Sequence, residues 1–118
     1  MLGLPSSVRI YLANEPTDMR KGIDSLSALV RRWGGDPFSG HLFVFMSRRR
    51  DRARILAWDR GGFILWYKRL ERGKFAWPKL MEAGKTAEVD AAQLAMLLDG
   101  VDFSQVKRGN RWEPKQAA

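Results

Sequence analysis

The sequence predicts a single α+β domain: a twisted antiparallel β-sheet meander with two helices packed on one face. Three observations support this fold class. Short apolar segments lie between turn residues, two other segments have the periodicity of helices, and a chain of 118 residues that is 45% hydrophobic can bury one core. We expect the domain to span residues 1–106, and residues 107–118 to form a flexible basic tail because they are polar and lack periodicity.

The first third of the chain predicts a strand, a helix and a second strand. Val8–Leu12 alternates in polarity and contains β-branched residues, which favours a strand. Thr17 or Asp18 can cap a helix that Gly34 and Gly35 end. The apolar positions of this helix are spaced by three and four residues, at Ile23, Leu26, Leu29, Val30 and Trp33.

The segment His41–Met46 is almost continuously apolar, which predicts a central strand buried on both faces. A basic loop, Ser47–Asp51, should follow it. Two strands, Ala53–Asp59 and Phe63–Leu70, then form a hairpin through the turn residues 60–62, Arg-Gly-Gly. Because these strands are linked by hairpins, we expect antiparallel pairing.

The last elements are shorter. Lys74–Trp77 predicts a brief strand, and Gly84–Val89 predicts a strand at an edge of the sheet. Asp90 should cap a second helix that Gly100 ends, with an apolar side formed by Leu94, Leu97 and Leu98.

Alternation along the second hairpin strand places large apolar side chains on both of its faces. Phe63, Leu65, Tyr67 and Arg69 point to one side, and the other side carries Ile64, Trp66, Lys68 and Leu70. One face must pack on the helices. The other face could be covered by the chain's own helices and turns, a second copy in a homodimer, another protein or stacked nucleobases.

Positive charge is concentrated in one part of the chain. The formal net charge is +8, and the segment Ser47–Trp77 holds ten of the 21 Lys and Arg residues against three acids. Nucleic acid is the most natural polyanionic partner, with an anionic membrane surface or an acidic protein as alternatives. The candidate phosphate-binding residues are Arg48, Arg49, Arg50, Arg52, Arg54, Arg60, Lys68, Arg69, Arg72 and Lys74, with Arg20 and Lys21 extending the patch.

Catalytic and cofactor chemistry finds little support. The chain has no cysteine and one histidine, His41, for which a hydrogen-bonded or surface position is the simplest interpretation. Asp51, Asp59 and Glu71 could converge as metal ligands of a nuclease, but ion pairing with neighbouring cations is the better prediction. No cofactor is expected. The start of the chain lacks the pattern of a signal peptide and no apolar run could span a membrane, so we expect a cytoplasmic protein.

Four segments of the chain, in order, resemble the TnpB-type accessory proteins that are encoded by the second open reading frame of insertion-sequence-sixty-six-family transposable elements. They are Asp18–Leu26, Asp36–Phe45, Arg54–Pro78 and Gln93–Phe103. The resemblance implies a bacterial accessory protein of transposition, encoded beside a separate DDE-type transposase. It supplies no catalytic residues.

The sequence and this resemblance together predict a non-catalytic DNA-binding protein that assists a transposase. Phosphate contacts carry no sequence information, so we expect weak sequence preference. The alternative is an adaptor that docks on the transposase without touching DNA.

Overall fold

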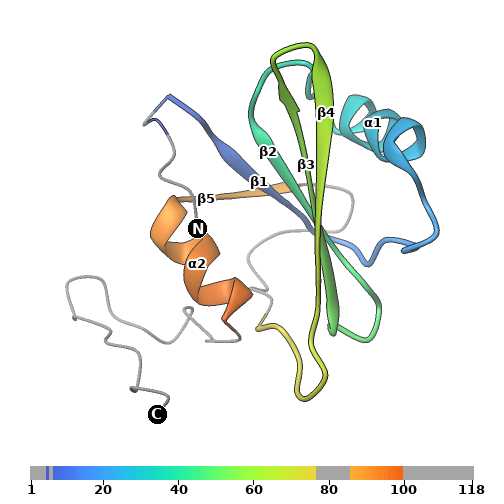
Figure 1. The fold of residues 1–118 in the computed structure, drawn as a ribbon, viewed down its shortest axis with the longest axis vertical. Helices are drawn as coiled ribbons and strands as arrows, with labels where there is room; N and C mark the ends of the chain where they lie inside the picture. The colour runs from blue at the N-terminus through green and yellow to red at the C-terminus, as the bar shows by residue number, and fades with distance from the viewer. Residues whose placement is uncertain (1–4, 6, 77–85, 100–118) are drawn as a thin grey trace.

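A mixed β-sheet separates two helices that lie on opposite sides of it (Figure 1). The computed structural model describes residues 5, 7–76 and 86–99. The five strands have the order β4-β3-β2-β1-β5. Their bounds are Ile10–Ala13 for β1, Leu42–Met46 for β2, Arg52–Asp59 for β3, Gly62–Arg69 for β4 and Thr86–Val89 for β5. The helices are α1, Ile23–Arg32, and α2, Ala91–Leu98.

The α+β class is confirmed, but the expectation of a wholly antiparallel sheet is wrong. Strand β1 runs parallel to β2, with Ile10 opposite Leu42 and Leu12 opposite Val44. Helix α1 connects these two strands, and a connection of this length allows parallel pairing. The meander holds for β2, β3 and β4, which pair antiparallel in succession.

The prediction that both helices cover one face is also wrong. Leu26 and Val30 of α1 pack with Phe43, Phe45 and Leu56 on one side of the sheet. The helix α2 residues Leu94, Leu97 and Leu98 pack on the other side, with Ile10, Leu12, Val44 and Ile55. Strand β2 is buried along its whole length, as its apolar run predicted, and a strand buried on both faces needs a cover on each.

Helix α1 begins later than expected. Its N-cap is Gly22, which makes no side-chain hydrogen bond, so neither Thr17 nor Asp18 caps the helix. The Asp18 carboxylate instead accepts hydrogen bonds from the backbone N–H and the guanidinium of Arg20. The predicted end is confirmed: Gly34 has φ +84°, and its N–H donates to the Arg31 carbonyl.

The predicted β3–β4 hairpin is present. Arg60 and Gly61 form its two-residue turn with φ values of 47° and 86°, and Gly62 already belongs to β4. Positive φ at both central positions is the signature of a type I′ turn.

The predicted strand at Lys74–Trp77 is absent over residues 74–76, and Trp77 lies outside the described residues. Phe75 is buried there as a loop anchor. Strand β5 confirms the predicted edge strand over Thr86–Val89 and pairs antiparallel with β1.

Helix α2 begins as predicted. The Asp90 carboxylate accepts from the Gln93 N–H, and the Gln93 side chain accepts from the Asp90 N–H. Gly84, Gly100 and the predicted tail 107–118 fall outside the described residues. Within the part of the chain that is described, neither helix has the length and apolar character needed to cross a bilayer.

Candidate nucleic-acid interface

One end of the sheet gathers most of the predicted phosphate-binding residues. Strands β1, β2 and β4 run in the same direction and finish at this end, where β3 begins (bottom of Figure 1). We call residues 48–52 and 69–74 the basic end. Its cations are Arg48, Arg49, Arg50, Arg52, Arg69, Arg72 and Lys74.

A tight turn between β2 and β3 presents the arginines at 48–50. The Ser47 N–H donates to the Arg52 carbonyl, and the Arg50 N–H donates to the Ser47 carbonyl. The Ser47 hydroxyl accepts from the Arg52 N–H and donates to the Asp51 carboxylate. Arg50 has φ 61°, a left-handed conformation that a long side chain adopts at a cost. The turn therefore has a defined shape, and Ser47 is a positioning residue that the sequence analysis did not identify.

The loop after β4 is held against this turn. The Leu70 N–H donates to the Asp51 carbonyl at 2.7 Å, and the Phe75 N–H donates to the Arg50 carbonyl at 2.6 Å. Phe75 is 1% exposed and belongs to the core on the α2 side. The two basic loops are thus fixed to each other and to the core.

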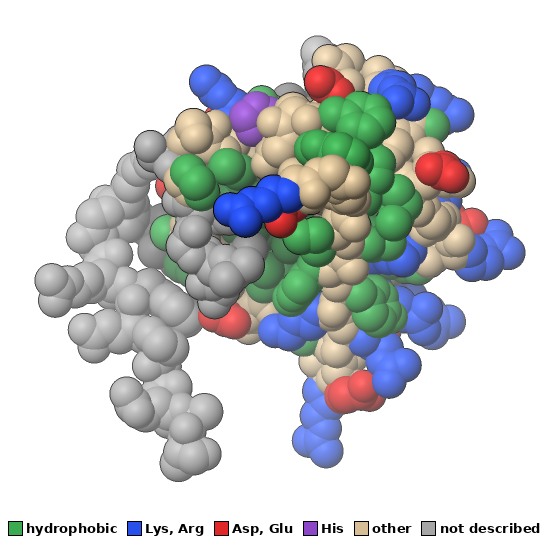
Figure 2. All heavy atoms as spheres, turned by 45° about the horizontal axis from the view of Figure 1, so that its top comes forward, with side chains coloured by type: hydrophobic (Ala, Val, Ile, Leu, Met, Phe, Trp, Pro, Cys, Tyr) green, Lys and Arg blue, Asp and Glu red, His purple; other side chains and the backbone are tan. Residues whose placement is uncertain are grey.

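Few carboxylates neutralise this end. Its seven cations face two acids, Asp51 and Glu71. Glu71 pairs with Arg69 at 2.9 Å and raises the pKa of that guanidinium, whereas Asp51 accepts from Ser47. Across the described residues, Arg48, Arg49, Arg50 and Arg52 have no ion pair, and all four are exposed. Figure 2 shows Lys and Arg side chains gathered over the lower and right parts of the surface.

A hollow of about 430 Å³ opens between this turn and the segment before α1. Arg48, Arg49 and Arg52 line one wall, and Thr17, Asp18 and Met19 line the other. Arg20 lies 2.7 Å from the Asp18 carboxylate and holds the pKa of Asp18 at about 2, below its ordinary 3.8. Because Arg20 pairs locally with Asp18, the remaining charges of the hollow are three arginines and the Asp51 carboxylate, which also lines it.

Arg54 and Lys68 are engaged by backbone carbonyls of other segments. The Arg54 guanidinium donates to the carbonyls of Met19, at 3.0 Å, and Lys21, at 2.6 Å, and lies over the Tyr67 ring. Lys68 Nζ donates to the Leu98 carbonyl, which terminates α2. Both side chains are partly buried and tie a segment to the sheet. Lys21 is itself partly buried.

The remaining predicted residue, Arg60, occupies the β3–β4 turn at the opposite end of the sheet. Asp59 lies there as well, while Asp51 precedes β3, so the two carboxylates are separated by roughly 25 Å of extended strand. The three acids considered as nuclease ligands therefore do not converge. The described residues contain no cluster of three or more His, Asp or Glu side chains suited to a metal.

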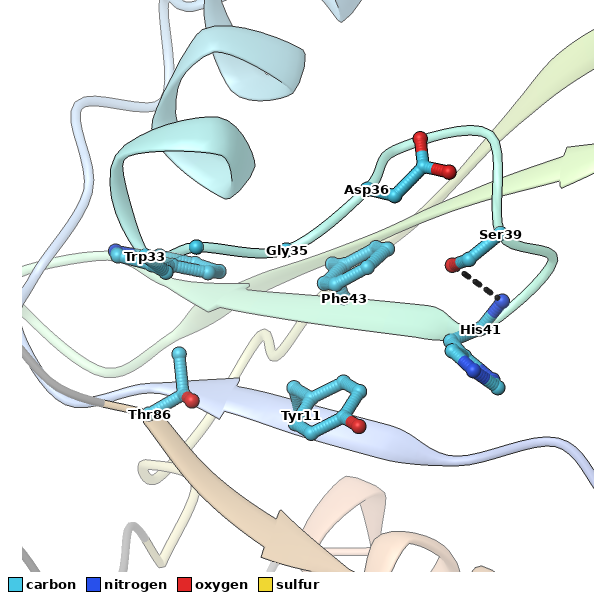
Figure 3. A pocket seen from close by; sticks show the side chains of 9 residues that line it. Tyr11, Trp33, Gly35, Asp36, Ser39, His41, Phe43 and Thr86 are labelled. Carbon is cyan, nitrogen blue, oxygen red and sulfur yellow. Dashed lines mark hydrogen bonds between the residues drawn. The ribbon is translucent and has the colours of Figure 1, made fainter.

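A separate pocket of about 350 Å³ lies beside the end of α1, and Figure 3 shows its lining. Tyr11 and Phe43 stack along its floor. Its polar groups serve the surrounding loop: Ser39 Oγ accepts from the His41 N–H, and Asp36 accepts from the Phe38 N–H. His41 Nδ1 accepts from the Arg9 N–H at 3.0 Å, which matches the predicted hydrogen-bonded histidine.

The fold and this surface define a small basic α+β protein with a cationic end built on two cross-braced loops. The chain belongs to the IS66 Orf2-like protein family, whose model matches residues 8–108. This membership associates it with insertion-sequence transposition in an accessory role.

Two proteins of Sinorhizobium fredii are similar along almost their whole length. The uncharacterized protein y4jC is 36% identical over 119 residues, covering 100% of both chains. The uncharacterized protein y4hO is 37% identical over 115 residues, covering 97% of this chain and 96% of its own. No solved structure matches the chain.

Proposed function

We propose that this chain is a non-catalytic accessory protein of DNA transposition that binds DNA through the basic end and assists a separately encoded transposase. The observation that carries the proposal is the row of exposed arginines at Arg48, Arg49, Arg50 and Arg52, which have no ion pair among the described residues and lie on a turn held in a defined shape. Guanidinium groups bind phosphate through two parallel hydrogen bonds, and a fixed turn loses less entropy on binding.

The geometry favours contacts to the backbone of DNA over contacts to bases. The cations come from loops at the end of a sheet, and neither helix presents a basic face at this end. Phosphate contacts position a protein without reading sequence. DNA at the element ends and random DNA should therefore bind with similar affinity, and the transposase would supply specificity.

The salt dependence of binding measures how many cations contact phosphates. If six contacts form, affinity should fall by about 10³-fold between 50 and 200 mM salt. Fluorescence anisotropy with labelled element-end and random duplexes, across that salt series, gives the slope directly. Absence of binding to either duplex at the lowest salt would refute DNA binding.

Two pairs of neighbouring exposed arginines provide a matched comparison. The double substitution Arg48→Gln and Arg49→Gln should weaken DNA binding and reduce the slope by about 2. The control, Arg31→Gln and Arg32→Gln, removes the same charge from the end of α1, at the opposite end of the sheet. Equal losses in the two variants would show that net charge, not the basic end, determines binding.

The adaptor alternative rests on the exposed apolar side chains of β4, which could contact a protein. Copurification with the transposase after nuclease treatment distinguishes the two functions. An assembly that survives without DNA, together with unchanged DNA binding in the Arg48 and Arg49 variant, would favour the adaptor.

A further inference from the structure

Strand β4 forms one edge of the sheet as it is described, and it is long and apolar. Ile64 and Trp66 on its α2 side are 51% and 40% exposed, and Tyr67 on its α1 side is 49% exposed. Proteins usually protect such an edge with a short strand, a proline or inward-pointing charges. The other edge follows that rule, since β5 has four residues and its exposed Glu88 pairs with Arg9.

The hairpin geometry determines which backbone groups of β4 face outward. Asp59 and Gly62 flank the two-residue turn, so this pair exchanges both of its backbone hydrogen bonds. Hydrogen-bonded pairs then alternate along the ladder, and Ile64 and Trp66 use their N–H and C=O groups toward β3. The N–H and C=O groups of Phe63, Leu65 and Tyr67 point away from β3.

We propose that two copies of this chain pair antiparallel through β4, with Leu65 on the two-fold axis, and so form one continuous sheet. An antiparallel edge pair has its axis perpendicular to the sheet, which keeps the α1 side of one copy beside the α1 side of the other. The outward groups of Phe63, Leu65 and Tyr67 would then hydrogen-bond to those of Tyr67, Leu65 and Phe63 in the second copy. This interface goes beyond the proposed DNA-binding function and does not depend on it.

Side-chain pairing selects this register. With Leu65 on the axis, Ile64 lies opposite Trp66 of the second copy, and Phe63 lies opposite Tyr67 of the second copy. Lys68 then faces Gly62, so that no charge lies opposite a large apolar side chain. Every exposed apolar side chain of β4 thus gains an apolar partner.

The neighbouring registers are poorer. Placing Trp66 on the axis sets Ile64 opposite Lys68 and Phe63 opposite Arg69. Placing Ile64 on the axis shortens the ladder. Lys68 of one copy then lies beyond the end of the second copy's β4, beside Arg60 in the hairpin turn of that second copy. Like charges at such a position destabilise a strand pair.

The interface has one electrostatic cost, which supplies a test. With Leu65 on the axis, Arg69 lies opposite Gly61, so Arg60 of the second copy comes near Arg69 at each end of the interface. Salt screens this repulsion, so the dimer should tighten as salt increases, whereas DNA binding weakens. The two interactions therefore respond to salt in opposite directions.

Sedimentation equilibrium of the full chain, freed of nucleic acid by nuclease and high salt, measures the dimer directly. We expect a mass twice that of the 13.5 kDa chain. Replacing both Ile64 and Trp66 by lysine should raise the dissociation constant by about 100-fold or more, since each lysine then faces a lysine across the axis. Replacing both by glutamate should do the same.

Mixing these two variants tests the register. In an equimolar mixture, position 64 of the lysine variant would face position 66 of the glutamate variant, and position 66 would face position 64. Each lysine would therefore face a glutamate, so a mixed dimer should form. The control, Ser25→Lys with Ala28→Lys, adds the same charge to exposed positions of α1 and should leave the dimer intact. Circular dichroism establishes that each variant is folded.

Three results would overturn the proposal. They are a monomeric wild-type chain at its highest soluble concentration, a lysine variant that dimerises as well as the wild type, and a mixture of the two variants that remains monomeric. In the last case, a wild-type dimer would have to use another surface, or another register of β4. None of these measurements contains DNA, so they leave the proposed DNA-binding function untouched.

Discussion

Arg54→Met is the substitution whose effect on stability the structure defines best. Methionine keeps an unbranched stem but removes the guanidinium, which donates to the carbonyls of Met19 and Lys21 and lies over the Tyr67 ring. These two bonds fasten the segment before α1 to the first half of β3. Because the guanidinium is partly buried and is engaged by backbone carbonyls, the variant should lose stability and keep its affinity for DNA.

The expected loss follows from three contributions. Each hydrogen bond from a charged donor contributes about 1.5–3 kcal/mol, so two contribute about 3–6 kcal/mol. Hydration of the freed carbonyls in an exposed loop reduces this loss. Arg54 Nε is buried without a hydrogen-bond partner among the described residues, a penalty of about 1 kcal/mol or more that methionine removes. The net destabilisation should be about 2–3 kcal/mol, which lowers the melting temperature by about 10–15 °C.

Urea unfolding followed by tryptophan fluorescence measures this difference, provided that the slope m is the same in both proteins. Arg54→Lys, which can retain one hydrogen bond, should fall between the wild type and Arg54→Met. Arg48→Gln is the control and should unfold at the wild-type midpoint. A loss below about 1 kcal/mol for Arg54→Met would refute the assignment of Arg54 as the link between these segments.

Three further predictions concern turns, caps and ion pairs. Arg60→Asn should stabilise the protein by about 0.5–1 kcal/mol in the urea assay. Asparagine tolerates the positive φ of the first type I′ position better than arginine does. A loss of stability would contradict this turn assignment. Asp90→Ala should cost about 1 kcal/mol through loss of the α2 N-cap, and an unchanged midpoint would mean that the cap is dispensable. In an NMR titration the Asp18 carboxylate should titrate at about 2, below the ordinary 3.8, and Arg20→Gln should return it toward 3.8. Since the folded-state pKa is depressed, the pair stabilises the fold above the ordinary pKa, and its contribution disappears as the pH falls through about 2; a midpoint near 3.8 in the wild type would exclude the pair in solution.

Local patterns predicted most strands and helices, because each depends on neighbouring residues alone. The apolar run of β2, the Arg60-Gly61 turn and the Asp90 cap were all visible in this way. The parallel pairing of β1 and β2 was missed, although strand, helix and strand in succession form the pattern of a parallel crossover. Three consecutive hairpin strands later in the chain outweighed that signal.

The predicted helix cap failed for a different reason. Asp18 has a side chain suited to capping, but it lies four residues before the N-cap, Gly22, and accepts from the backbone N–H and the guanidinium of Arg20. A bidentate pair with a guanidinium is stronger than a bond to a backbone N–H. Such a competition between two local partners cannot be decided from residue types alone.

The candidate interface was only partly predictable from the sequence. The density of arginines indicated the turn at 48–50, and this needed no structure. Arg52 is an exposed cation and Arg54 is a structural link, and this difference depends on what covers each position. Arg52 lies at the exposed start of β3, whereas the segment before α1 covers Arg54 two residues further on. The contact between the two basic loops depends on Phe75 entering the core, which residue types did not indicate.

The interior position of β1 has a consequence for the synthesis of the protein. Strand β1 is made first, but it lies between β2 and β5, and β5 is made more than seventy residues later. A nascent chain that has produced β1 to β4 therefore carries an open strand edge at each side of its sheet, and the side at β1 closes when residues 86–89 leave the ribosome. A chain interrupted before Thr86 would keep the β1 edge open and should therefore aggregate.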